Sequence, residues 1–223
     1  MGEAIGAMLA SAVGITISPL PLIAVILMLA TPRGRVNGVA FTAGWVIALA
    51  VVTSVVVLAG SGIDTDGGKP AWSSWLELAL GVLLLLLGAR RWWERPRQGH
   101  VTEPPKWMRT VDTFTPAKSA GLAAALVVAN PKNLVLAVGG AVSIATSGAD
   151  GGGKAVAVAL MVAIGSLCTL LPLGVHLLGG QRSATVLGEW KAWTSVHNTA
   201  IMTVLPVVLG AEYVGGAISS LAA

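Results

Sequence analysis

Lys132 stands inside an apolar stretch that runs from about residue 117 to residue 146. A charge at the centre of a bilayer costs at least about 2.5–3.5 kcal/mol on insertion scales, so such a residue usually faces a partner or a wet cavity. No acidic residue falls at a matching depth, because Glu77 and Glu212 lie nearer the ends of their own apolar stretches. The lysine therefore predicts a site for an anion such as a phosphate, sulfate or carboxylate. The alternative is a lysine that caps free carbonyls or extends to the interface.

Three prolines interrupt apolar stretches at similar depths, namely Pro19, Pro21 and Pro131. Proline has no N–H and its ring clashes with the carbonyl four residues back, so each proline breaks or kinks a helix. A freed carbonyl is tolerated in hydrocarbon only where it is buried in protein or faces water. The prolines thus predict that the first and fourth helices are broken near the midplane, around a cavity. The alternative is that they only kink packed helices.

Short polar side chains flank these breaks. Ser18, Asn130 and Asn133 bring hydrogen-bonding groups to the depth of Lys132, and we predict that all four bind substrate. Two helices that restart at the breaks would also direct their positive N-terminal ends to the same level, which favours an anion. Glu77 and Glu212 are candidates for proton or ion coupling; the alternative is that they anchor helix ends at the interface.

The elements that position these residues are six long apolar stretches in a chain of 223 residues, of which 55% are hydrophobic and 11% charged. Each stretch is long enough to cross about 30 Å of hydrocarbon at about 1.5 Å per residue. The predicted fold is therefore an all-α membrane protein with six transmembrane helices. The stretches cover roughly Ala4–Ala30, Val36–Gly60, Trp72–Ala89, Ala117–Thr146, Lys154–Gly179 and Asn198–Leu221.

The basic residues predict the orientation of these helices. The first, third and fifth loops carry 11 of the 14 lysines and arginines, whereas the opposite side carries only Lys69 and Lys154. Because basic loops stay in the cytoplasm, both termini are expected outside a cell membrane. The third loop also places Trp107, Met108, Val111 and Phe114 on one face of a short helix. This segment is expected to lie on anionic inner-leaflet lipids or to be a solvated linker.

The two proline-broken stretches also suggest an internal repeat. Each is followed by two further spans, and a unit of three spans that is repeated once must invert its orientation. The predicted organisation is a single membrane domain over residues 1–223, with repeats at 1–93 and 117–223 joined by a basic cytoplasmic linker at 94–116. Many secondary transporters have this architecture, with a substrate site where broken helices meet.

Four sequence segments resemble a known family. They are Ile17–Leu22 (ISPLPL), Thr31–Arg35 (TPRGR), Gly44–Trp45 and Ala129–Leu134 (ANPKNL). With them the chain resembles the actinobacterial GAP or Sap family of glycopeptidolipid- and sulfolipid-addressing proteins, which is grouped with the lysine-exporter superfamily. The resemblance covers essentially the whole chain and implies a part in moving lipids or glycolipids from the cytoplasmic leaflet toward the cell surface. It supplies no agreed set of functional residues.

The leading functional hypothesis is a translocator for a lipid or glycolipid with an anionic headgroup, driven by an ion gradient or by substrate supply. The alternatives are a small-solute exporter for amino acids or ions, and a non-transporting accessory subunit of a larger lipid exporter. An enzyme is disfavoured because the spans contain no Ser/His pair, HExxH motif or paired aspartates. Metal export is also disfavoured, and no metal site is predicted, because the expected midplane lacks carboxylates and histidines and contains a cation. No cofactor and no nucleic-acid partner is expected.

Overall fold

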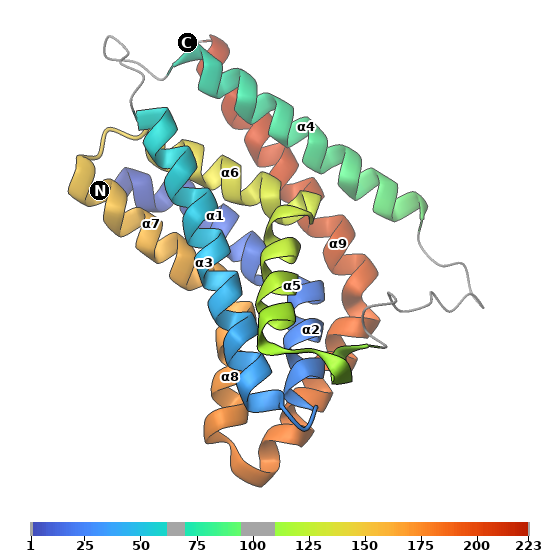
Figure 1. The fold of residues 1–223 in the computed structure, drawn as a ribbon. Coiled ribbons are helices and arrows are strands. Elements are labelled where there is room, and N and C mark those ends of the chain that lie inside the picture. Colours follow the sequence, from blue (N-terminus) through green and yellow to red (C-terminus); the bar gives the residue numbers. More distant parts are fainter. Residues whose placement is uncertain (1, 62–69, 95–109, 223) are drawn as a thin grey trace.

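A computed structural model describes residues 2–61, 70–94 and 110–222 of the chain. Within these ranges every regular element is a helix, and no strand occurs (Figure 1). The α-helices are α1 (Gly2–Thr16), α2 (Pro19–Leu29), α3 (Gly34–Ser61), α4 (Ala71–Trp93), α5 (Pro116–Val128), α6 (Pro131–Ala145), α7 (Gly151–Gly165), α8 (Leu167–Leu178) and α9 (Ser183–Ala222), with short 3-10 helices η2 (Val111–Thr113) and η3 (Gly180–Arg182).

Length and composition make this a multi-pass membrane protein. Three continuous helices, α3, α4 and α9 with η3, are long and apolar enough to cross a bilayer. Three bent pairs pass the same test when each pair is counted as one span, which gives up to six spans in the described part of the chain. Many large apolar side chains are exposed, among them Leu58, Leu178 and Val196 at 75%, 90% and 79%. Lipid tails are a suitable environment for such a surface.

The predicted breaks in the first and fourth spans are confirmed. The axis bends by 49° between α1 and α2 and by 68° between α5 and α6. Pro19 and Pro131 each occupy the first position of the second helix, where a missing N–H costs nothing. Pro21 lies two residues further along the first turn of α2 and does not interrupt that helix.

A third break lies in the fifth span, where the sequence predicts a continuous helix. The axis bends by 57° between α7 and α8, and the junction residue is Ser166 rather than a proline. Pro172 lies well inside α8. The second span, α3, is continuous over 28 residues, so the corresponding spans of the predicted repeats differ in shape.

The last helix starts earlier than the predicted span at Asn198. α9 begins at Ser183 and runs for 40 residues, so Trp190 and Lys191 lie on a helix rather than in a loop. No proline occurs between Ser183 and Asn198, and the single Gly188 there does not end the helix. Pro206 is accommodated within the helix. At about 1.5 Å per residue, this helix is roughly twice as long as a bilayer core is thick.

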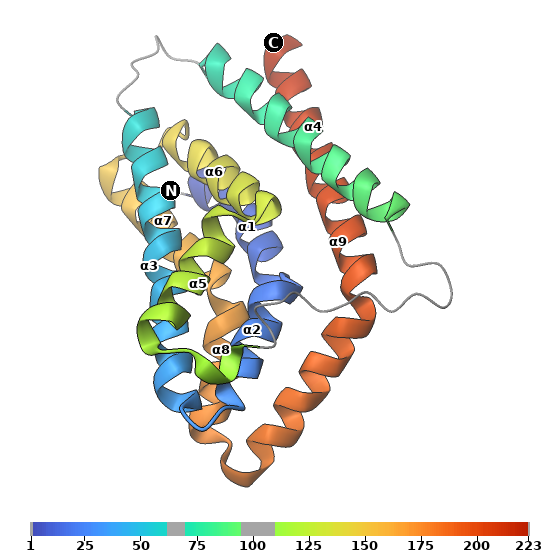
Figure 2. The ribbon, with the colours of Figure 1, turned by 45° about the vertical axis from the view of Figure 1, so that its right-hand side comes forward.

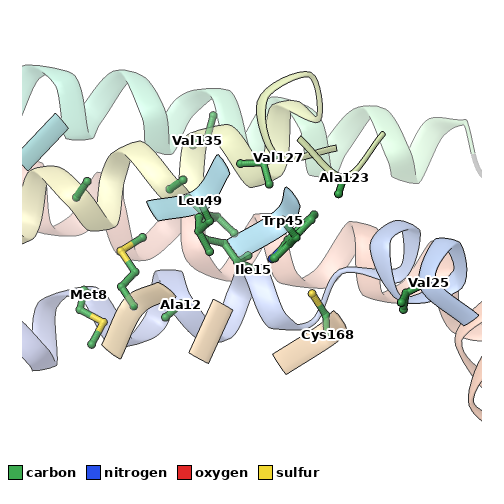
Figure 3. Packing of buried hydrophobic residues seen from close by; sticks show 14 of the residues in the cluster. Met8, Ala12, Ile15, Val25, Trp45, Leu49, Ala123, Val127, Val135 and Cys168 are labelled. Atoms are coloured by element: carbon green, nitrogen blue, oxygen red, sulfur yellow. The ribbon is translucent and has the colours of Figure 1, made fainter. Parts of the chain in front are cut away.

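The helices form two groups (Figures 1 and 2). α4 and α9 lie side by side as one pair, whereas α1, α2, α3, α5, α6, α7 and α8 gather around a common core. The pair contributes Leu84, Leu209 and Tyr213 to that core. Glycines allow the close approach of the pair, because a Cβ at Gly81 would lie 2.9 Å from the backbone nitrogen of Val214 and one at Gly210 would lie 2.8 Å from the carbonyl of Gly81. Figure 3 shows Trp45 and Leu49 of α3 packed with Ile15 of α1 in the core.

The start of the predicted interfacial segment, including Trp107, lies outside the described residues. From Thr110 onward the chain enters η2, whose Val111 is only 2% exposed and belongs to the protein core. Asn37 Nδ2 donates to the carbonyl of Phe114 at 2.9 Å and fixes the approach to α5. Val111 therefore packs against protein.

Candidate functional site

A cavity lies where α4 and α9 meet the broken spans. Its volume is about 500 Å³, it is partly open, and its walls combine apolar side chains with charged ones. The break between α5 and α6 forms one side of it. The lining residues are Leu20, Leu87, Arg90, Arg91, Glu94, Leu122, Ala125, Leu126, Ala129, Asn130, Pro131, Lys132, Met202 and Pro206.

Lys132 reaches from the first turn of α6 to the end of α1. Its Nζ donates to the carbonyl of Gly14 at 2.9 Å and to that of Ile17 at 3.2 Å. Pro21 has no N–H to offer Ile17, and the last carbonyls of a helix lack intrahelical partners. The cation also lies at the negative end of the α1 dipole, which compensates part of its burial at 4% exposure. The lysine thus caps freed carbonyls while it lines the cavity.

Ser18 and Asn133 connect the two proline breaks. Ser18 Oγ donates to Asn133 Oδ1 at 2.7 Å, and Asn133 Nδ2 donates to the carbonyl of Leu126 at 3.3 Å. Both side chains are buried, at 2% and 1% exposure. Leu126 is in the last turn of α5, so this short chain of bonds supplies a partner to a carbonyl that the break leaves free.

The third break is capped in the same manner. Thr16 Oγ1 donates to the carbonyl of Ile164 at 2.5 Å, and Trp45 Nε1 donates to that of Gly165 at 3.2 Å. These are last-turn carbonyls of α7, and their donors come from α1 and α3. Residues 16–18, at the break between α1 and α2, therefore contact the other two breaks. At each of the three breaks, the free carbonyls at the end of the preceding helix accept hydrogen bonds from side chains of other helices.

The predicted site residues divide into two groups. Lys132, Asn130 and Pro131 line the cavity. Ser18 and Asn133 bond to each other and do not line it. Pro19 and Pro21 do not line it either, although Leu20 between them does. Glu77 and Glu212 are also not part of the cavity wall. Glu77 lies in the α4–α9 contact, where a Cβ at Gly216 would be 3.6 Å from its Oε1.

Two arginines at the end of α4, Arg90 and Arg91, were considered in the sequence only as part of the positive charge of the third loop. Arg90 and Arg91 line the cavity together with Lys132, and their side chains are 73% and 58% exposed. Their position in the last turn of an apolar helix, beside Trp92 and Trp93, is the signal that could have identified them. Such arginines extend toward headgroups from an apolar stem.

Glu94 pairs with both arginines. Its Oε1 lies 2.7 Å from Arg90 Nε, and its Oε2 lies 4.0 Å from Arg91 Nη1. The hydrogen bond from Arg90 holds the pKa of the Glu94 carboxyl below its ordinary value. The carboxylate thus occupies one side of the arginine pair, as an acidic ligand would.

The comparisons with known proteins identify the chain's family. No significant match was found among curated proteins or among solved structures. The family model described as "Sap, sulfolipid-1-addressing protein" matches residues 8–219. This range includes all three breaks and the whole cavity wall. Because the match covers nearly the whole chain, the chain belongs to this Sap family.

Proposed function

We propose that this protein moves a lipid or glycolipid with an anionic headgroup from the cytoplasmic leaflet toward the cell surface. The observation that carries the proposal is the cavity of about 500 Å³ that places Arg90, Arg91 and Lys132 beside apolar walls. A lipid has the same division between a charged head and an apolar tail. The family description, which names a sulfolipid, supports a role in lipid transport or export.

In this proposal the two arginines contact the headgroup first. Arginine presents a planar fork of donors that matches the oxygens of a sulfate, phosphate or carboxylate. Lys132 has three N–H donors and directs two of them to carbonyls, so the third is available to an anion in the cavity. Leu87, Leu122 and Met202 supply the apolar surface that accompanies the acyl chains.

The transport cycle that we propose is alternating access between two inverted three-helix repeats. The proline breaks at corresponding positions in the first and fourth spans support the repeat. The capped breaks would act as hinges, since their carbonyls are held by side chains that can exchange partners. Rocking of one repeat against the other would then expose the cavity to either side.

The test is movement of a fluorescent anionic lipid across liposomes that contain the purified protein, with a zwitterionic lipid as the specificity control. We expect an Arg90→Gln, Arg91→Gln variant to lose most transport of the anionic lipid. Arg33→Gln, Arg35→Gln removes the same charge from exposed positions outside the cavity and should retain it. Equal loss in both variants would contradict a headgroup site at the cavity.

Two other results would favour different functions. Transport of neither lipid by the wild type, together with normal folding, would favour an accessory subunit of a larger lipid exporter. Transport of a free amino acid or ion, with no lipid movement, would favour a small-solute exporter.

A further inference from the structure

A second basic cavity lies between α3 and α7, away from the arginine pair. Its volume is about 500 Å³, and its walls are the apolar side chains of Val57, Leu58, Ala155 and Val158 with two serines. Lys154 lies at one end of it, where Nζ donates to Ser61 Oγ at 3.1 Å and to the carbonyl of Ala145 at 2.6 Å. This cavity therefore also has one cationic end and an apolar body.

Helix α6 connects the two cavities. Lys132 is the second residue of α6 and lines the first cavity, whereas Ala145, the last residue of α6, contacts Lys154. Fifteen residues of helix cover roughly 20 Å, which is most of the thickness of a bilayer core. The two cationic groups are thus about 20 Å apart along a single helix.

The second cavity is also partly open at the protein surface. Leu58 is 75% exposed, and Val51 and Val55 continue the exposed face of α3 toward the middle of the helix. An acyl chain in this position would lie along α3 and α7 with its headgroup at Lys154. A soluble anion would not use the apolar walls, and an uncharged lipid would not use the lysine.

We infer that the cavity between α3 and α7 is a second lipid site, which holds the anionic headgroup of a membrane lipid at Lys154 with one acyl chain between the two helices. The inference rests on the proposed function in one respect, because it makes this site the place of release for the same class of lipid. Lys154 binds the headgroup by charge and is not a coupling residue.

The experiment uses the full chain in nanodiscs with phosphatidylglycerol that carries a photoactivatable group on its acyl chain. Cross-linked peptides are mapped by mass spectrometry, and photoactivatable phosphatidylcholine is the comparison. We expect phosphatidylglycerol to label residues 54–61 and 155–158, and Lys154→Met to reduce this labelling by about fivefold. Lys118→Met removes the charge of a more exposed lysine that lies outside the cavity, and it should leave the labelling unchanged.

A second variant protects the test against misfolding of Lys154→Met. Ala155→Phe keeps the lysine and fills the cavity, so it should abolish the labelling while peptides from α5 around Leu122 are still labelled. Equal labelling by the two lipids, or full labelling of Lys154→Met, would overturn the second site. Loss of transport in the Arg90, Arg91 variant is measured separately, so either proposal can fail without the other.

Discussion

Ser18 Oγ donates to Asn133 Oδ1 over 2.7 Å and thereby joins the break in the first span to the break in the fourth. The two residues are 115 positions apart in the chain, and both are buried. Asn133 then donates to the carbonyl of Leu126, so one amide serves both breaks. If the broken spans move against each other during transport, this bond must change its partners.

Asn133→Leu should lower the free energy of unfolding by about 1–3 kcal/mol, because Ser18 and the carbonyl of Leu126 both lose a buried partner. A double-mutant cycle with Ser18→Ala measures the pair itself, and we expect a coupling of about 0.5–2 kcal/mol. Ser143→Ala is the control, since Ser143 bonds only within α6, to Gly139. Additive effects of the Ser18 and Asn133 changes would show that the bond does not form.

Lys132→Met should affect both stability and transport. The variant leaves the carbonyls of Gly14 and Ile17 without their donor, which should cost about 1–3 kcal/mol in chemical unfolding from detergent micelles. Lys132→Arg keeps the charge and the donors in a different geometry, so it should retain part of both. Unchanged stability in Lys132→Met would contradict the capping role, and unchanged transport would contradict the role in headgroup binding.

Gly81→Val should separate α4 from α9 and lower the melting temperature. The new Cβ would lie 2.9 Å from backbone and side-chain atoms of Tyr213 and Val214, and overpacking of this kind typically costs about 1–3 kcal/mol. Gly215→Val is the matched control on α9, because a Cβ there meets nothing within 4 Å. Similar melting temperatures for the two variants would mean that the helices are not packed closely at Gly81.

Binding of a sulfate-headed amphiphile should become tighter as the pH falls from about 6 to 3. Arg90 holds the pKa of Glu94 below its ordinary value, so the ion pair is present above that pKa and is lost as the pH falls through it. A sulfate ester stays ionised in this range and then meets the arginines without competition. Glu94→Gln should bind tightly at all of these pH values. A parallel pH dependence in the variant would assign the effect to another group.

The predicted orientation can be tested with single cysteines in a Cys168→Ala background. An impermeant thiol reagent applied to intact cells should label Gly152→Cys, at the exposed start of α7, and not Arg33→Cys. The reason is the excess of basic residues on the side that carries Arg33. Labelling of Arg33→Cys without labelling of Gly152→Cys would show that the orientation is opposite to the predicted one.

The sequence by itself determined the number of apolar stretches that can span a membrane and two of the three breaks. The length of each apolar stretch decides whether it can cross a bilayer. A proline marks a helix break by its covalent structure alone, because it lacks an N–H and its ring clashes with the preceding turn. Pro19 and Pro131 could therefore be identified without any neighbour. The match of the family model to residues 8–219 likewise follows from the sequence.

Only the tertiary structure decided how the breaks are stabilised and which charges meet. The bend at Ser166 has no proline; it is held by Thr16 and Trp45, donors that the chain brings from α1 and α3. In the same way, packing of α4 and α9 against the broken spans brings Arg90 and Arg91 to the cavity of Lys132. A freed carbonyl or a cation is satisfied by whichever group lies within about 3 Å of it, and sequence spacing does not specify contacts between distant segments.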